Sequence, residues 1–128
     1  MSETGERRSV YESVGGMTFF RRLVDAFYRR VEEDEVLVLL YPEDDMDGAR
    51  ERLTLFLGQY WGGPTTYSER RGHPRLGMRH APFWIDQDAR DRWVTHMNAA
   101  IDEVTPPDDI AKVMRDYFDM AADAMMNR

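Results

Sequence analysis

The chain has no cysteine among its 128 residues, which excludes a disulfide framework, a thiolate metal site and a cysteine-bound iron–sulfur centre. Histidine is also scarce, and His73, His80 and His96 do not show the HExxH-like spacing typical of zinc enzymes. A glycine-rich GxGxxG stretch for binding a dinucleotide is missing as well. The sequence therefore gives no support for thiol chemistry, for a zinc site or for binding of a nicotinamide cofactor.

Long apolar runs are absent too. No stretch approaches the roughly 20 apolar residues of a membrane-spanning helix, and the polar opening from Met1 to Arg8 predicts no signal peptide. A net charge of −7 and a pI near 4.9 argue against nucleic acid or an anionic membrane as the main partner. We therefore expect a cytoplasmic protein, either a monomer or a homodimer.

What the chain does have is helical periodicity. Apolar residues recur at three-and-four spacing in four stretches, and no alternating strand pattern accompanies them. This predicts an all-α fold with a single domain over residues 11–128, preceded by a flexible segment over residues 1–10. The four stripes are Phe20, Leu23, Val24, Phe27, Tyr28 and Val31; Ala49, Leu53, Phe56, Leu57 and Tyr60; Ala89, Trp93, Met97, Ala100, Ile101 and Val104; and Ile110, Val113, Met114, Tyr117, Phe118, Ala121, Ala124 and Met125.

Capping residues set the expected helix boundaries. Ser9 to Val14 can form one helical turn before Gly15-Gly16, and Asp34 can cap a short helix from Glu35 to about Leu40. We expect irregular backbone between Gly62 and His73. The other N-caps expected before a helix are Asp45 or Asp47, Asp86, and Thr105 with Pro106 at the first helical position.

The segment Gly72 to Phe83 holds the histidine of greatest interest. Pro74 suits a first helical position and Ala81-Pro82 forces an end, so His80 is predicted at the end of a short helix. Leu76, Met78 and Phe83 make its surroundings apolar. Two interpretations fit these residues: a core histidine that closes a helix, or an axial haem ligand with one ring nitrogen on iron and the other N–H on a carbonyl.

The order of these features resembles the truncated haemoglobins, bacterial globins with a two-over-two helical sandwich. The second group of that family, and its actinobacterial members above all, is similar in local sequence from about Tyr11 to Asn127. The strings that carry the resemblance are Phe27-Tyr28, Tyr41-Pro42-Glu43-Asp44-Asp45, Gln59-Tyr60-Trp61-Gly62-Gly63-Pro64, Gly72-His73-Pro74-Arg75-Leu76 and Met78-Arg79-His80-Ala81-Pro82-Phe83.

The resemblance implies a haem b cofactor with His80 as the proximal iron ligand. It places Tyr28, Tyr41 and Trp93 on the distal side as the residues that act on a bound ligand. It also implies a set of residues around the haem: Ala49, Leu53, Phe56 and Leu76 in the apolar wall, Arg79 at a propionate, and Arg52, Tyr67 and His73 as further candidates for the rim. His96 matches no role in the family, and we interpret it as a partly exposed structural histidine.

An indole N–H donates, and a tyrosine hydroxyl donates or accepts, so the three distal residues would form fixed donors to an anionic ligand. Because Ala49 has no atom that reaches iron, O2, NO, CO or peroxide could bind at the sixth position. Slow release of oxygen is expected, with peroxidase-like or nitric-oxide-oxidising activity that needs an external reductase. The alternatives are a haem-based oxygen or redox sensor acting through a partner, and a helical interaction module whose His80 is structural.

Overall fold

The computed structural model describes residues 9–41, 45–73 and 83–128. Within these ranges every regular element is a helix, as the sequence predicts. The elements are α2 (Val10–Ser13), α3 (Met17–Glu32), the 3-10 helix η1 (Leu37–Leu40), α4 (Met46–Tyr60), α5 (Thr66–Arg71), α7 (Gln87–Val104) and α8 (Asp108–Met125). None of the helices in the described ranges is long and apolar enough to cross a membrane.

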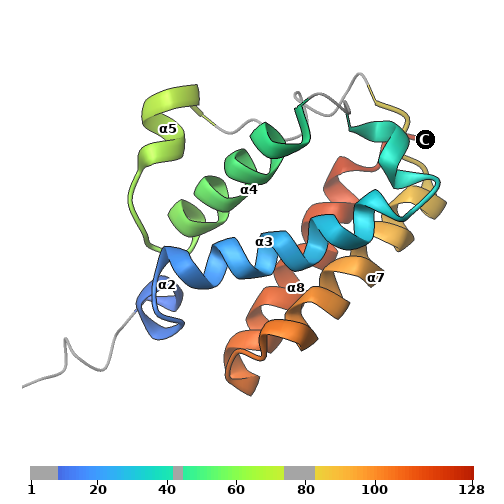
Figure 1. The fold of residues 1–128 in the computed structure, drawn as a ribbon. Helices are drawn as coiled ribbons and strands as arrows, with labels where there is room; N and C mark the ends of the chain where they lie inside the picture. The colour runs from blue at the N-terminus through green and yellow to red at the C-terminus, as the bar shows by residue number, and fades with distance from the viewer. Residues whose placement is uncertain (1–8, 42–44, 74–82) are drawn as a thin grey trace, which may run out of the picture.

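Four helices form two layers. Figure 1 shows α3 and α4 in one layer and the antiparallel pair α7 and α8 in the other. Helix α3 packs against both α4 and α7, so it joins the layers. The predicted two-over-two arrangement is confirmed.

Helix α3 owes its central position to its apolar face. Phe20, Leu23 and Val31 on that face have no solvent-accessible surface. Full burial of such a side chain stabilises a fold by about 1.5–3 kcal/mol. The same stripe carries Tyr28, whose ring is buried among apolar neighbours.

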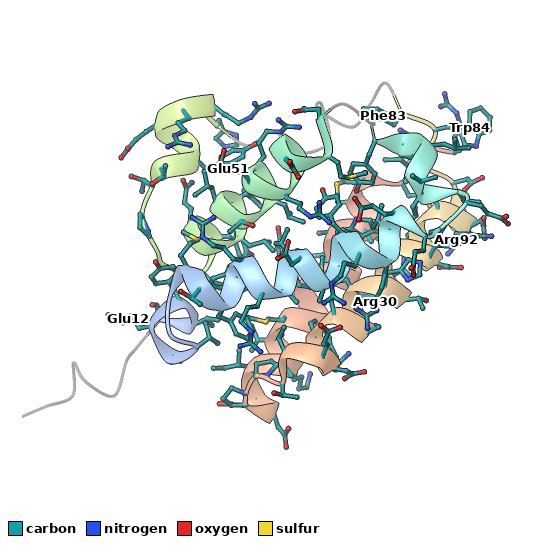
Figure 2. All side chains as sticks on the ribbon, viewed as in Figure 1. Glu12, Arg30, Glu51, Phe83, Trp84 and Arg92 are labelled. Atoms are coloured by element: carbon teal, nitrogen blue, oxygen red, sulfur yellow. The ribbon has the colours of Figure 1, made fainter. Side chains whose placement is uncertain are left out.

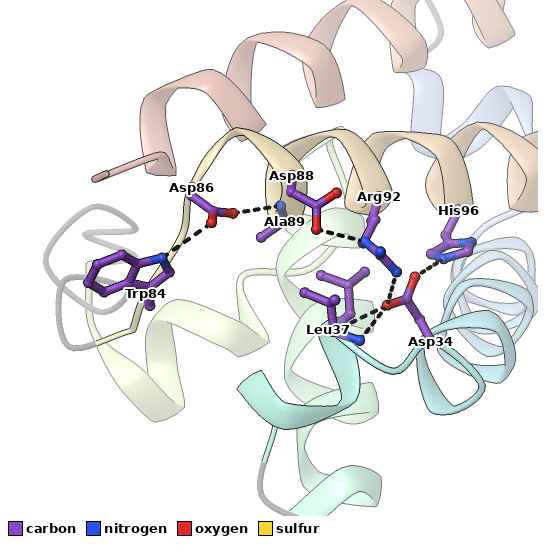
Figure 3. Close-up of polar contacts among 9 residues, drawn as sticks. Asp34, Leu37, Trp84, Asp86, Asp88, Ala89, Arg92 and His96 are labelled. Carbon is purple, nitrogen blue, oxygen red and sulfur yellow. Dashed lines mark hydrogen bonds and ion pairs between the residues drawn. The ribbon is translucent and has the colours of Figure 1, made fainter.

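Capping side chains stand at the start of several helices, and two of them, Asp34 and Asp86, are caps that the sequence predicts. Ser9 and Glu12 form a capping box at α2. The Asp86 carboxylate accepts a hydrogen bond from the Ala89 N–H at 2.9 Å and caps α7. Asp34 accepts from two backbone N–H groups at the start of η1 (Figure 3), although the helix it begins is a 3-10 helix and starts at Leu37.

The structure corrects the role predicted for Thr105. The sequence predicts it as the cap that begins the last helix, but it ends α7, with a left-handed φ of 47° and a hydrogen bond from its N–H to the Ile101 carbonyl at 3.0 Å. Pro106 disfavours a right-handed helical conformation at the residue before it. Pro107 has an extended backbone conformation, with a ψ of 149°, so the next helix starts only at Asp108.

The prediction of irregular backbone between Gly62 and His73 is also wrong, because helix α5 lies within that stretch. It is held by a contact distant in sequence: the Gln59 side chain of α4 accepts from the Ser68 N–H at 2.9 Å and donates to the Ser68 hydroxyl at 2.7 Å. Local pattern alone does not reveal such a tertiary contact. Likewise, Asp45 stands at the N-cap position of α4, but its carboxylate pairs with Arg52 at 2.8 Å.

Polar contacts fasten the layers and the end of the chain. Arg29 and Arg30 of α3 pair with Glu103 of α7, and Figure 2 shows Arg30 between these helices. Near the C-terminus, Asn127 accepts from the Ile85 N–H at 2.9 Å and donates to the Phe83 carbonyl at 2.8 Å. The C-terminal residues therefore hold the backbone that leads into α7.

Candidate functional site

A cavity of about 590 Å³ lies between the two layers. Its size falls in the range of about 300–1,000 Å³ that small-molecule and cofactor sites occupy. Helices α3, α4, α5, α7 and α8 all contribute to its wall. The described residues of the wall are Tyr28, Leu40, Tyr41, Asp45, Ala49, Arg52, Leu53, Phe56, Leu57, Tyr67, Arg71, Phe83, Trp93, Tyr117, Phe118, Ala121 and Met125.

Three aromatic residues with polar ends meet on one side of this cavity. Tyr28 comes from α3, Tyr41 follows η1, and Trp93 lies on α7. The rings of Tyr28 and Tyr41 meet edge to face, with centroids 5.3 Å apart. The indole of Trp93 is fixed between Phe27 and Phe118, at centroid distances of 5.2 and 5.7 Å.

Hydrogen bonding links the three polar groups. Burial raises the pKa of Tyr41, while hydrogen bonds with Trp93 and Tyr28 act in the opposite direction. The pKa of Tyr28 is raised by burial first, then by the nearby Tyr41 and the hydrogen bond with it. These effects show that the polar ends of Tyr28, Tyr41 and Trp93 lie together, and the net effect of burial is a raised pKa for both tyrosines. All three residues are therefore neutral at physiological pH.

Two cationic side chains lie in the wall of the same cavity, and a third lies against the Tyr28 ring. Arg52 and Arg71 lie in the wall, and Arg52 also pairs with Asp45 at 2.8 Å. The guanidinium of Arg50 lies over the Tyr28 ring, 5.8 Å from its centroid. Guanidinium groups bind carboxylates in a planar, two-pronged geometry, so this part of the wall suits a ligand with carboxylate groups.

Most of the residues that the sequence singles out lie in this wall. Besides the three aromatic residues, the wall holds Ala49, Arg52, Leu53, Phe56 and Tyr67. His73 is exposed after α5 and is not among the described residues of the wall. Leu76, Arg79 and His80 lie outside the described residues.

The face of α8 is the part of the wall that sequence reasoning does not assign to the site. Tyr117, Phe118, Ala121 and Met125 belong to a stripe that the periodicity marks as buried, without distinguishing core from cavity wall. Leu40, Leu57 and Phe83 complete the apolar surface. Nothing in the sequence indicates that Arg71 lies in the cavity wall, because its position depends on helix α5, which the sequence did not predict.

The model of the bacterial-like globin family matches residues 9–127. This chain belongs to that family. The globin is 53% identical to a thermostable haemoglobin from the actinobacterium Thermobifida fusca, with a TM-score of 0.91 over 94% of this chain and 98% of that one.

The comparisons also place this globin among the group II truncated haemoglobins. It is 36% identical over 118 residues to the Bacillus subtilis protein named "Group 2 truncated hemoglobin YjbI", covering 92% of this chain and 88% of that protein. A structure described as a truncated oxygen-avid haemoglobin from Bacillus subtilis is 34% identical, with a TM-score of 0.88 over 94% of this chain and 100% of that one. Membership of this family implies a haem cofactor and the binding of oxygen and other diatomic ligands.

The described wall fits a haem group. Apolar side chains from both layers offer a surface for the flat macrocycle, and polar groups gather on one side of the cavity. The cations Arg52 and Arg71 in the wall match the charge of the propionates. Because Tyr28 and Tyr41 stay protonated, their O–H groups and the Trp93 N–H can donate hydrogen bonds to a ligand in the cavity.

Proposed function

We propose that this globin binds haem b through His80 and holds oxygen by hydrogen bonds from a distal set of Tyr28, Tyr41 and Trp93. Bound haem would supply an iron that can bind O2, NO, CO or peroxide beside these residues. The observation that carries the proposal is the meeting of three neutral polar aromatic groups on one side of the cavity. Slow release of oxygen follows from their chemistry, and a related Bacillus subtilis protein is described as oxygen-avid.

Each distal residue has a separate task in this proposal. Trp93 offers an N–H on a ring that Phe27 and Phe118 hold in place, so little entropy is lost when it binds a ligand. Tyr41 lies in the cavity wall beside Trp93 and offers its own hydroxyl proton to the ligand. Tyr28 acts through Tyr41. A hydrogen bond to a charged group contributes about 1.5–3 kcal/mol, so two such bonds slow release by on the order of a hundredfold or more.

Stopped-flow measurement of oxygen dissociation tests this proposal. Trp93→Phe is expected to speed dissociation by roughly tenfold to a hundredfold, which matches the loss of one charge-assisted hydrogen bond. Tyr41→Phe is expected to have a smaller effect. The control is Trp84→Phe, since Trp84 is 62% exposed and its indole bonds Asp86 at the surface. If Trp93→Phe changes the rate no more than the control does, the indole serves for packing alone.

The iron ligand is tested separately. His80→Gly is expected to lose haem or to retain it only with added imidazole, which can replace the missing side chain. His96→Gln is the matched control, because His96 lies on α7 and is not among the described residues of the cavity wall. A normal haem absorption spectrum in His80→Gly without imidazole would overturn the assignment.

Redox chemistry on the ligand, such as peroxide reduction or nitric-oxide oxidation, also belongs to the proposal. The sequence has no cysteine and no dinucleotide fingerprint, so electrons would come from a separate reductase. We expect the purified protein to turn over slowly with NADH alone and faster once a reductase is added. Rapid NADH consumption by the pure protein would contradict this dependence.

A further inference from the structure

We propose that Asp34 is a positioning residue for the distal site: its carboxylate fixes the segment that carries Tyr41 against the helix that carries Trp93. This inference rests on the proposed function, because it concerns the same two donors. It also gives His96 a structural role, as the partner of Asp34.

The Asp34 carboxylate joins two parts of the fold (Figure 3). Its side chain is only 6% exposed. One oxygen, Oδ1, accepts from the N–H groups of Val36 and Leu37, both at 2.9 Å. The same oxygen lies 3.2 Å from the Arg92 guanidinium, and Oδ2 lies 2.7 Å from Nε2 of His96.

On one side, these bonds hold the segment that leads to Tyr41. Asp34 follows α3, and its carbonyl accepts from the Val38 N–H at 3.0 Å. With the two bonds to its side chain, Asp34 thus fixes the first turn of η1. The Tyr41 N–H bonds the Val38 carbonyl at 3.3 Å, so the backbone of Tyr41 is attached to the same turn.

On the other side, the bonds hold the part of α7 around Trp93. Arg92 precedes Trp93 directly, and His96 lies three residues after it, about one helical turn away. The two side chains that reach Asp34 therefore share one face of α7, next to the face that carries Trp93. A shift of η1 relative to α7 would change the distance between the Tyr41 hydroxyl and the Trp93 N–H.

Removing the carboxylate leaves buried groups without their partner. Arg92 would keep its pair with Asp88, at 2.9 Å, and His96 would lose its bond to Oδ2. Asp34→Asn would keep an oxygen for the N–H groups of Val36 and Leu37, but it would place an N–H2 group opposite His96 and remove the charge that faces Arg92. The link between η1 and α7 would weaken, and the segment that carries Tyr41 would shift relative to Trp93.

The first test measures oxygen dissociation from the haem-loaded protein. Asp34→Asn replaces one carboxylate oxygen by an N–H2 group and is expected to speed dissociation by about threefold to tenfold, less than loss of the Trp93 donor itself. Asp86→Asn is the matched control: Asp86 also caps a helix with its carboxylate and bonds a tryptophan indole, but at the surface. The control is expected to leave the rate unchanged.

The second test needs no cofactor. In the cofactor-free protein, Asp34→Asn is expected to shift the NMR signal of the Trp93 indole N–H, because the neighbouring Tyr41 moves. Trp93→Phe assigns that signal. Asp86→Asn is expected to shift the Trp84 signal and leave that of Trp93 in place. An unchanged Trp93 signal in Asp34→Asn overturns the inference.

A double variant shows whether Asp34 acts through Tyr41. In a Tyr41→Phe background, Asp34→Asn should add little to the dissociation rate, because the group it positions is gone. A full additional effect overturns the inference. His96→Gln, whose amide can still donate to Asp34, should behave like the wild type, whereas His96→Leu should speed dissociation in the direction of Asp34→Asn.

The experiments distinguish failure of the proposed distal function from failure of the proposed role of Asp34. If Trp93→Phe and Tyr41→Phe both leave oxygen dissociation unchanged, the proposed distal function is wrong. If both change it while Asp34→Asn matches Asp86→Asn, the distal function holds and Asp34 has no positioning role.

Discussion

Tyr41 shows how one hydroxyl can decide the character of a binding site. Its hydroxyl lies beside Tyr28 and Trp93 in the cavity wall, and in the proposed site its proton goes to the ligand. Tyr28 has the opposite position in the proposed site, because it acts on the ligand only through Tyr41.

The first prediction follows from this difference. Tyr28→Phe alone should speed oxygen dissociation less than Tyr41→Phe, because the Tyr28→Phe variant still has the Tyr41 proton to donate to the ligand. The effects of Tyr41→Phe and Trp93→Phe should not add in the double variant, because the groups share one hydrogen-bond network. Dissociation rates of the single and double variants measure both effects. A Tyr28→Phe effect as large as that of Tyr41→Phe would mean that Tyr28 contacts the ligand directly.

Asp34 gives a second prediction at this scale. Burial alone would raise the pKa of its carboxyl, but the bonds from the Leu37 N–H, His96 and the Val36 N–H, with the Arg92 charge, lower it to about 2 from an ordinary value of 3.8. Because the folded-state pKa is depressed, the stabilisation is present above the unfolded pKa. It is lost as the pH falls from about 4 towards 2.

We therefore expect Asp34→Asn to be about 2 kcal/mol less stable than the wild type near pH 6, with a smaller difference as the pH falls below 4. Urea unfolding at several pH values measures this difference. Asp116→Asn is the control, since Asp116 forms a highly exposed pair with Lys112 and such pairs contribute little. A difference that does not change with pH would show that Asp34 acts through its shape alone.

At the level of helices, local pattern carried most of the information. The apolar stripes predicted α3, α4, α7 and α8, and the carboxylates of Asp34 and Asp86 predicted two helix starts. Helix α5 could not be predicted in the same way, because it has no stripe and depends on Gln59 from another helix. Thr105 was misread because a hydroxyl before proline suits a helix start, and only the backbone angles reveal that it ends one.

Thr105 also provides a stability prediction. A left-handed conformation costs an L-residue about 1–2 kcal/mol, and glycine adopts it without this cost. Thr105→Gly is therefore expected to stabilise the protein by about 1 kcal/mol, despite the greater freedom of glycine in the unfolded chain. Thermal unfolding measures the change. Thr95→Gly, in the exposed interior of α7, should destabilise by about 1 kcal/mol. Destabilisation by Thr105→Gly would show that the threonine side chain matters more than its backbone strain.

For the whole molecule, the sequence singled out the polar aromatic residues of the cavity wall but not the part of the wall on α8. Tyr28, Tyr41 and Trp93 stand out because polar-tipped aromatic residues are unusual on three separate helical segments. Tyr117 and Phe118 of α8 do not stand out, because a stripe that lines a cavity has the same period as a stripe in a core. Distinguishing the two requires the distance between the layers, which is a property of the assembled fold.

The cavity draws its wall from nearly every helix, and this leads to a prediction for the whole fold. A ligand that binds only the folded state stabilises it, by about 4 kcal/mol at a thousand times its dissociation constant. Haem addition is expected to raise the unfolding temperature by roughly 10 °C or more. Differential scanning calorimetry with and without haem measures the shift, and His80→Gly should show a smaller one. Equal shifts in both proteins would indicate haem adsorption outside this site.

A wall assembled from both layers also has a consequence for the lifetime of the protein. Without haem, the apolar surfaces of α4 and α8 that face the cavity have fewer partners, so partial opening and cleavage by proteases should be more frequent. Protease digestion would then remove cofactor-free molecules first and spare the loaded ones. The amount of this globin in a growing cell would follow the supply of haem, even at a constant rate of synthesis.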